Sequence, residues 1–399
     1  MHSLPKKKWI LPLLAAVNIG NYLDRQLIYS LFPILKAEFQ TSDFQLGLLG
    51  TGFMLTHAVA TIPFGILADR WSKPKLITVG MVFWSLFTFI SGLSRHFYQL
   101  FIARGLIGIG GATFEPAAVS LITENYDESY RGRALGIVKT GMWVGGMAGL
   151  ILGGVLGTYI GWRYTLFLAA LPGFVLAFFT WNISGEKMSV AGQKTDGHKD
   201  KIFDWSGLVI LIIIGGIFVT YSSGAFIAWV ITFIVRYDYF ELSTAAVLLG
   251  GVATVSGVAG ILVGSTIADL WHQKNKGGRM LTVAFGMLFS IPFICLSIYA
   301  PNRIMVILGV SLGTFFMAWY HGPIMAVLMD VVAPATRGAM IGAYLFFIHM
   351  FGAMPAPAVV GIISDMSNLR IGLLTTVLGN LLCAFCFFIA FSKLKRSRK

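Results

Sequence analysis

The stretch 124–132, ENYDESYRG, returns 206 residues later as 330–338, DVVAPATRG. Each copy opens on an acidic residue and closes on an Arg-Gly pair that begins seven positions later. Gly136 and Gly342 continue the match at the same offset. Repetition at a fixed offset predicts that the chain consists of two duplicated halves.

Further matches follow in the same order along the chain. Arg163 and Arg370 open apolar segments at an offset of 207, and Asp69 has a weaker counterpart in Asp269. Chance could give one such match, but four in order indicate duplication. Duplicated halves in an apolar chain are typical of secondary transporters.

The composition requires lipid as the solvent for much of the chain. Of its 399 residues, 56% are hydrophobic and 12% are charged, whereas soluble domains average roughly 25% charged residues. Segments of about 20 apolar residues cross the hydrocarbon core as helices. Twelve such segments are visible: 9–35, 45–69, 76–94, 98–123, 133–160, 163–183, 205–235, 243–270, 280–300, 303–329, 337–364 and 370–391. We therefore expect an all-α membrane protein with twelve transmembrane helices in two pseudo-symmetric halves.

The domain boundaries follow from one long polar stretch. Residues 185–204 are rich in charge and lack an apolar period. We expect a six-helix half at 1–184, a cytoplasmic linker at 185–204 and a second six-helix half at 205–399.

The basic residues predict the orientation. If both termini are cytoplasmic, cytoplasmic segments carry 21 of the 30 Lys and Arg residues and outer loops carry 6. This asymmetry is typical of the positive-inside rule. We expect a multi-pass protein of the cell's inner (plasma) membrane. The net charge of +13 is spread in short clusters, which argues against nucleic acid as a partner.

Several motifs resemble those of a known family. GILADRWSKPK at 65–75 resembles the loop between helices 2 and 3 of the major facilitator superfamily. Within it, the chain most resembles the spinster family. The stretches that carry this likeness are NYLDR (21–25), RGLIGIGGA (104–112), YRGRALGI (130–137), WYHGP (319–323) and VVAPATRGAMIGAY (331–344).

The resemblance implies a function as well as the major facilitator fold. It implies a proton-coupled symporter or antiporter for an amphiphilic lipid, such as a lysophospholipid or sphingoid lipid. A transporter of a small organic anion (a sugar acid) or of a drug is the alternative. We expect lipid or small molecule, proton and membrane lipids as partners, and a monomer.

Charged residues in the first predicted helix are the leading candidates for function, because charge within the hydrocarbon is costly. Asp24 could bind a proton and gate an ion pair, or it could fix the helix through a structural salt bridge. The resemblance links the matching aspartate to proton coupling. Arg25 points about 100° away from Asp24, whereas Asn21 shares a face with it. Asn21 and Arg25 are candidates for substrate binding or charge pairing.

The fourth helix departs from the family pattern. Spinster-like proteins commonly carry an acidic residue where this chain has Gly111, and here an acid appears one turn later at Glu115. We hypothesise that Glu115 replaces the missing carboxylate in proton coupling, paired with Arg104, Arg25 or Lys139. Alternatively, Glu115 braces the helix beside a proline. Arg104 could bind an anionic head group or pair with Asp24, and Lys139 could instead extend toward the cytoplasmic surface.

Three further residues are candidates for the substrate cavity: Tyr320, His321 and Trp143. The prolyl residue that follows His321 interrupts the backbone hydrogen bonds there, which favours a cavity wall. Histidines and aromatic residues in spans are also common packing residues.

A separate group of charges is predicted to gate the cytoplasmic ends. Asp69 could pair with Arg131 or Arg133 as a latch that forms in one state and parts in another. The other members of this group are Arg70, Glu124, Asp330 and Arg337.

The sequence contains no catalytic constellation, no Walker motif and no pattern of metal ligands, so we expect no enzyme activity, no cofactor and no metal. Cys295, Cys383 and Cys386 lie in apolar segments, where packing is their expected role.

Overall fold

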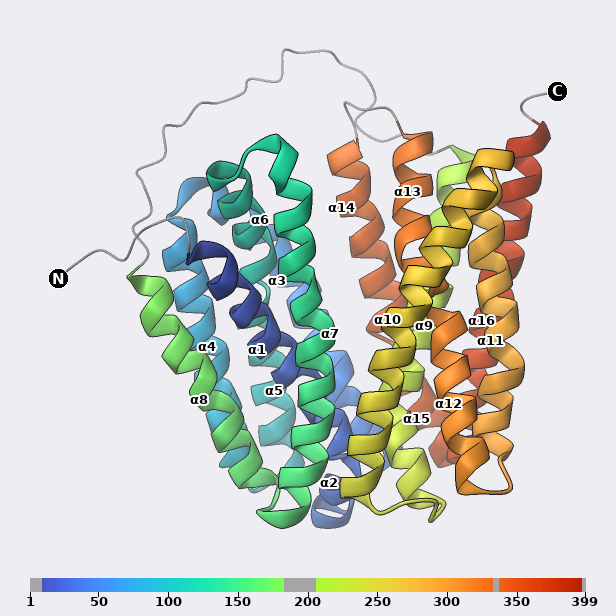
Figure 1. The fold of residues 1–399 in the computed structure, drawn as a ribbon. Helices are drawn as coiled ribbons and strands as arrows, with labels where there is room; N and C mark the ends of the chain where they lie inside the picture. The colour runs from blue at the N-terminus through green and yellow to red at the C-terminus, as the bar shows by residue number, and fades with distance from the viewer. Residues whose placement is uncertain (1–8, 183–205, 333–336, 397–399) are drawn as a thin grey trace. The chain divides into compact units, whose positions relative to one another are not determined.

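The computed structural model describes residues 9–182, 206–332 and 337–396. All regular elements in these ranges are helices (Figure 1). The chain divides into two compact units: Met1–Lys194 with Glu241–Gly250, and Thr195–Phe240 with Gly251–Lys399. The predicted linker at 185–204 lies outside the described residues.

The elements form the twelve spans that the sequence predicts. The first eight helices are α1 (Ile10–Ser30), α2 (Phe32–Phe39), α3 (Asp43–Arg70), α4 (Lys73–Gly92), α5 (Phe97–Gly111), α6 (Phe114–Asn125), α7 (Glu128–Tyr159) and α8 (Trp162–Trp181). The others are α9 (Gly207–Arg236), α10 (Leu242–Lys274), α11 (Gly278–Tyr299), α12 (Arg303–Met317), η1 (Ala318–Tyr320), α13 (His321–Val331), α14 (Arg337–Phe347), η3 (Ile348–Ala353), α15 (Ala356–Met366) and α16 (Leu369–Arg396).

Eleven stretches of the described residues are long and apolar enough to cross a membrane. The first span, α1, is not among them. It carries several polar side chains, including Asp24 and Arg25. The described span that does not meet this criterion is therefore the one with the leading functional candidates.

Four spans predicted as single helices are interrupted in the structure. The interruptions lie at Leu31, between α5 and α6, at η1, and at the π-helical turn η3. Each of them precedes a proline within a few residues: Pro33, Pro116, Pro323 and Pro355. Proline has no N–H to donate to the carbonyl four residues earlier, so the helical ladder is locally broken there.

A stripe of glycines packs α7 against α1 in the first unit (Figure 1). A Cβ atom added at Gly145 would lie 2.2 Å from the Ile19 carbonyl oxygen, and one at Gly149 would lie 2.3 Å from that of Leu23. Small residues at intervals of four allow two membrane helices to approach closely. α1 is thereby fixed against α7.

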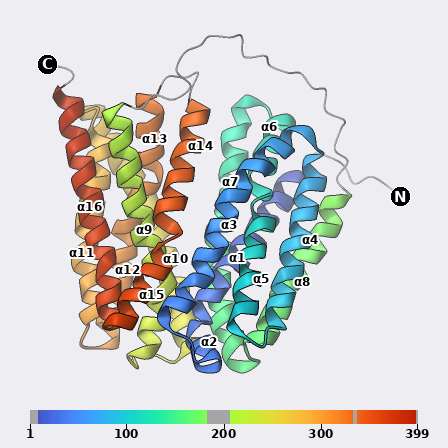
Figure 2. The ribbon, with the colours of Figure 1, turned by 180° about the vertical axis from the view of Figure 1, so that it is seen from behind.

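Other close pairs complete each unit. α4 packs along α8 in the first unit and α9 along α16 in the second, as Figure 2 shows. In the second unit Gly260 of α10 contacts the backbone of Phe315 on α12 so closely that an added Cβ atom would lie 2.1 Å from its carbonyl oxygen.

The arginine that opens the last helix of each unit contacts the end of the unit's first span. Arg163 of α8 bonds Glu38 of α2 at 2.5 Å. Arg370 of α16 lies over the ring of Tyr237, 4.4 Å from its centroid, just after α9 ends. The sequence repeat at these arginines therefore corresponds to a repeated packing position.

Candidate functional site

A buried ion pair joins α1 to α5 in the first unit. Arg104 Nη1 donates to Asp24 Oδ1 at 3.4 Å and to the Asp24 carbonyl oxygen at 3.2 Å. The hydroxyl of Thr88 on α4 donates to Asp24 Oδ2 at 2.5 Å. Asp24 is 3% exposed and Arg104 is 1% exposed. A charged pair at such burial is stable only while both partners are present.

Arg104 retains unused donor capacity within this cluster. Its Nε atom is buried and has no hydrogen-bond partner among the described residues. Its guanidinium lies 5.5 Å from the ring centroid of Phe53 on α3. The geometry therefore holds the arginine by one carboxylate, one carbonyl and one aromatic face.

Arg25 turns to a different side of α1, as expected for adjacent helical residues. Its guanidinium lies 5.4 Å from the ring centroid of Tyr22 and 5.9 Å from that of Phe53. Phe53 thus contacts both arginines. The described contacts of Arg25 are aromatic, and they leave its cation available to an anionic group.

Gly111 faces Asn21 and His57. A Cβ atom built at Gly111 would lie 3.1 Å from Asn21 Nδ2 and 3.6 Å from His57 Cδ2. A larger side chain at this position would displace Asn21. The small residue at Gly111 and the position of Asn21 are therefore coupled.

A second ion pair lies one turn further along the same span. Glu115 in the first turn of α6 bonds the ammonium group of Lys139 on α7. Of the three cations considered as partners for Glu115, the structure pairs it with Lys139. Both side chains are substantially exposed, 46% for Glu115 and 57% for Lys139. This pair differs from Asp24–Arg104 in its access to solvent.

Two aromatic side chains flank this second pair. Trp143 lies on α7 four residues after Lys139, which places both on one face. Tyr22 of α1 interacts electrostatically with the ammonium group of Lys139. The result is a charged pair with aromatic neighbours on α1 and α7.

The remaining cavity candidates lie in the second unit. The rings of Tyr320 and His321 are stacked with centroids 4.0 Å apart. His321 opens α13, two residues before Pro323, and is half-buried. The structure therefore places these two residues together, in a different unit from Asp24 and Glu115.

Two of the predicted gating acids, Glu124 and Asp330, each bond a basic residue that opens a neighbouring helix. Glu124 near the end of α6 bonds Lys73 at the start of α4 at 2.7 Å. Asp330 near the end of α13 bonds Arg279 at the start of α11 at 2.6 Å, and Arg279 also bonds Asp269 at 2.9 Å. Lys73 and Arg279 are 206 residues apart, the offset that separates the two acids. The two ion pairs are equivalent members of the repeat.

The other gating candidates have separate surroundings. Arg131 Nε donates to the Tyr126 carbonyl oxygen at 3.0 Å, and Arg133 lies 5.6 Å from the ring centroid of Tyr130. Arg70 is exposed. The side chains of Asp69 and Arg337 lie outside the described part of the structure, so the predicted latch from Asp69 stays a prediction.

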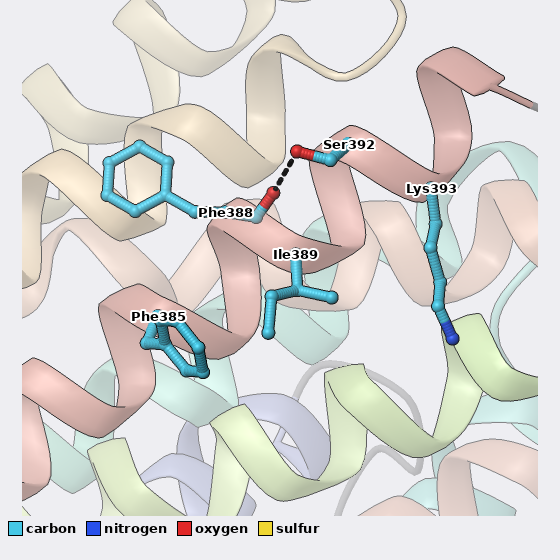
Figure 3. A pocket seen from close by; sticks show the side chains of 5 residues that line it. All are labelled: Phe385, Phe388, Ile389, Ser392 and Lys393. Atoms are coloured by element: carbon cyan, nitrogen blue, oxygen red, sulfur yellow. Dashed lines mark hydrogen bonds between the residues drawn. The ribbon is translucent and has the colours of Figure 1, made fainter.

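A shallow depression of about 330 Å³ lies along α16 in the second unit (Figure 3). Its lining consists of Phe385, Phe388, Ile389, Ser392 and Lys393. The Ser392 hydroxyl donates to the Phe388 carbonyl oxygen at 2.9 Å, which leaves the floor largely apolar. None of the candidate residues lies in it, and we assign it no role in transport.

Sequence reasoning missed three contributors to these clusters: Thr88, Phe53 and the pairing role of Lys73. Thr88 and Phe53 belong to no motif: only the packing of α4 brings Thr88 to Asp24, and only that of α3 brings Phe53 to the two arginines. Lys73 was detectable, because its offset from Arg279 matches that of the two acids.

Paired charges inside spans and a repeated set of ion pairs are typical of a multi-pass membrane transporter. A family model described as the Major Facilitator Superfamily matches residues 14–357. This chain belongs to the major facilitator superfamily.

Within the superfamily the chain is spinster-like. Protein spinster homolog 1 of Xenopus laevis is 25% identical over 381 residues, which cover 89% of this chain and 72% of the relative. The sphingosine-1-phosphate transporter SPNS2 of Xenopus tropicalis is 26% identical over 384 residues, covering 89% and 73%. An MFS-type efflux pump of Mycolicibacterium smegmatis is 25% identical over 406 residues, covering 98% and 94%. The similarity to these relatives indicates that the chain is a transporter and not an enzyme.

The fold agrees with solved structures. A bacterial homologue of the human lysosomal transporter spinster, in an inward-facing and unoccupied conformation, matches with a TM-score of 0.87. It is 22% identical, and the match covers 98% of each chain.

Proposed function

We propose that this protein is a secondary active transporter that moves an amphiphilic lipid by alternating access, coupled to protons. The observation that carries the proposal is the buried Asp24–Arg104 pair, an ionisable acid held by a cation between two spans. The similarity to the sphingosine-1-phosphate transporter SPNS2 supports a lysophospholipid or sphingoid lipid as substrate.

Asp24 is the proposed proton carrier. Protonation would remove its charge and convert one oxygen into a donor, which weakens the bond to Arg104. Arg104 would then be a buried cation without a counter-charge. Such a cation favours either rearrangement of α1 against α5 or the approach of an anionic substrate.

Glu115 is the proposed second carboxylate of the coupling system. Gly111 stands where spinster-like proteins commonly carry an acid, and Asn21 occupies the space beside it. Glu115 places a carboxylate one turn away, roughly 6 Å along the helix axis. A Glu115→Gln protein whose transport kept the wild-type pH dependence would contradict this role.

The gating proposal concerns the ion pairs Lys73–Glu124 and Arg279–Asp330. They would join helices at one end of each unit in one state and part in another. Asp69, Arg70, Arg131, Arg133 and Arg337 belong to the same proposal.

The proposed arrangement in the membrane follows the basic residues, with both termini cytoplasmic and halves at 1–184 and 205–399. Of cysteines placed at Arg95 and Lys276, only the one at Arg95 should react with an impermeant maleimide added to intact right-side-out vesicles, and the one at Lys276 should react only after permeabilisation. Labelling of both from the same side would refute this topology. The protein is proposed to work as a monomer.

Coupling is tested in proteoliposomes with an imposed pH gradient. Transport of a fluorescent lysophospholipid should follow the gradient in the wild type and lose this dependence in Asp24→Asn. Transport that is indifferent to the gradient in the wild type would refute proton coupling.

The alternative substrate is a small organic anion or a drug. The similarity to an MFS-type efflux pump over 98% of this chain supports it. A lysolipid should raise the melting temperature of the purified protein and a sugar acid should not. The reverse result would favour the alternative.

A further inference from the structure

Among the ion pairs in the described spans, Glu115–Lys139 lies far from the ends of its helices and still has exposed side chains. Glu115 lies about 10 residues before α6 ends at Asn125, and Lys139 about 11 residues after α7 begins at Glu128. At 1.5 Å per residue, both lie about 15–17 Å from that end of the unit. Charged groups exposed at such depth face water rather than acyl chains, because lipid contact is costly for them.

The pair is also built to exchange partners. The carboxylate bond to Glu115 uses one of the three N–H donors that the Lys139 ammonium carries. Lysine is a compact point charge on a flexible stem, which suits phosphate as well as carboxylate. By contrast, Arg104 is fully enclosed with Asp24, so an anion reaches it only after that pair opens.

The surroundings of Lys139 match an amphiphile. Trp143 continues the same face of α7 away from the charge, and Tyr22 of α1 lies within electrostatic range of the ammonium group. Gly146, almost one turn beyond Trp143, lies against Gln26 of α1, with 3.6 Å from an added Cβ atom to Gln26 Cγ. An anionic head group at Lys139 would therefore place the chain that follows it beside the face of α7 that carries Trp143.

We infer that Lys139 binds the anionic head group of the transported amphiphile and that Glu115 occupies its place when the site is empty. This inference rests on the proposed lipid transport and names its substrate class: amphiphiles with a phosphate monoester or carboxylate head. The incoming anion displaces the Glu115 carboxylate, and the carboxylate closes the site again on release.

The test is equilibrium binding of radiolabelled oleoyl lysophosphatidate to purified protein in nanodiscs, with two matched competitors. Mono-oleoylglycerol has the same chain without the charge, and glycerol phosphate has the same charge without the chain. The wild type should prefer the lysophosphatidate over both competitors. Lys139→Gln should weaken its binding about tenfold or more while leaving mono-oleoylglycerol unchanged, and Lys139→Arg should restore most of it.

The Glu115→Gln variant distinguishes competition from a structural role by the direction in which its affinity for lysophosphatidate changes. If Glu115 competes with the head group, its neutral isostere binds lysophosphatidate more tightly than the wild type. If the pair is merely structural, both Glu115→Gln and Lys139→Gln weaken binding or leave it unchanged, and the inference is overturned. Lys36→Gln, which removes a cation paired with Asp43 near the start of α3, is the matched control and should have no effect.

The other outcomes separate this inference from the proposed function. Equal wild-type binding of both oleoyl compounds, with no effect of Lys139→Gln, refutes the head-group site but leaves lipid transport standing. Binding of neither oleoyl compound refutes both. Glycerol phosphate that binds as tightly as lysophosphatidate refutes the amphiphilic substrate and favours the small organic anion.

Discussion

Asp24 and Arg25 are neighbours in sequence, yet their environments differ sharply. Adjacent helical residues point about 100° apart, so Asp24 faces Arg104 and Thr88 whereas Arg25 faces the rings of Tyr22 and Phe53. The sequence predicted that the two cannot share one partner. It named Arg104 as a possible partner of Asp24, and the structure pairs the two. The sequence could not single out this pairing, because three cations, Arg25, Arg104 and Lys139, lie in the interior of the predicted spans.

Removal of Arg104 should destabilise the protein far more than removal of Arg25. Arg104→Ala leaves a buried carboxylate without its counter-charge, at a cost of about 3–5 kcal/mol. Arg25→Ala loses cation–π contacts worth about 0.5–1 kcal/mol each at accessible sites. Thermal unfolding of the purified variants should show this order, and equal losses would contradict the difference in burial.

Glu38 should contribute an acid-sensitive part of the stability. The hydrogen bond from Trp162 Nε1 and the pairing with Arg163 hold the pKa of this carboxyl below its ordinary value, against a smaller opposing effect of burial. A lowered folded-state pKa means stabilisation that is present above the unfolded pKa and lost as pH falls through the folded one. Glu38→Gln should therefore lower the melting temperature at neutral pH and flatten its fall in acid. A wild-type acid profile in this variant would contradict the argument.

At the scale of the helix, small residues and prolines decide how the spans are built. The α1–α7 contact depends on glycines whose missing side chains admit the opposing backbone. A series of glycines at intervals of four on one helix indicates a packing face. It does not identify α1 as the partner, since the spacing of glycines on one helix says nothing about which neighbour fills the groove.

Two glycines of α7 should respond to alanine with opposite signs. A methyl group at Gly149 would lie 2.3 Å from the Leu23 carbonyl oxygen, so Gly149→Ala must shift α1 at a cost of about 1–3 kcal/mol. A methyl group at Gly136 would have no neighbour within 4 Å. Gly136→Ala should be neutral or stabilise by up to about 1 kcal/mol, because alanine favours the helix. Melting temperatures of the two variants that moved together would refute the packing argument.

The interruptions of the spans show where sequence reasoning stopped short. Length and hydropathy predict each span as one continuous helix. Pro33, Pro116, Pro323 and Pro355 each remove one backbone donor near a break, but proline alone does not predict a break. Pro63, Pro172 and Pro292 lie inside continuous helices. The form of each break depends on packing, which explains why one is a 3₁₀ turn and another a π turn.

Across the whole molecule, the repeat was predictable and the ion pairs that it contains were only partly so. The offset of 206 identified Glu124 and Asp330 as equivalent. It applies equally to Lys73 and Arg279, which the structure shows to be their partners. Ion pairs between helices remain ambiguous in a sequence with several acids and bases at the same ends.

Both of these ion pairs oppose the dipoles of the helices that carry them. Lys73 is the first residue of α4 and Arg279 the second of α11, where a cation meets the positive end of a helix. Glu124 and Asp330 stand next to last in α6 and α13, where an anion meets the negative end. Each unfavourable placement costs about 0.3–1 kcal/mol, so the pairs are weaker than the same charges exchanged. A weak pair suits a contact that must open during transport.

Exchanging the charges of Lys73 and Glu124 should therefore stabilise the protein and slow its transport. Lys73→Glu alone brings two carboxylates together and should lower the melting temperature. Adding Glu124→Lys restores the pair with each charge now favoured by its helix dipole, so the double variant should melt at or above the wild-type temperature. If the pair must part during transport, its turnover in proteoliposomes should fall below that of the wild type. Wild-type turnover in a more stable double variant would show that the pair holds the fold and does not gate, whereas a double variant less stable than the wild type would refute the dipole argument itself.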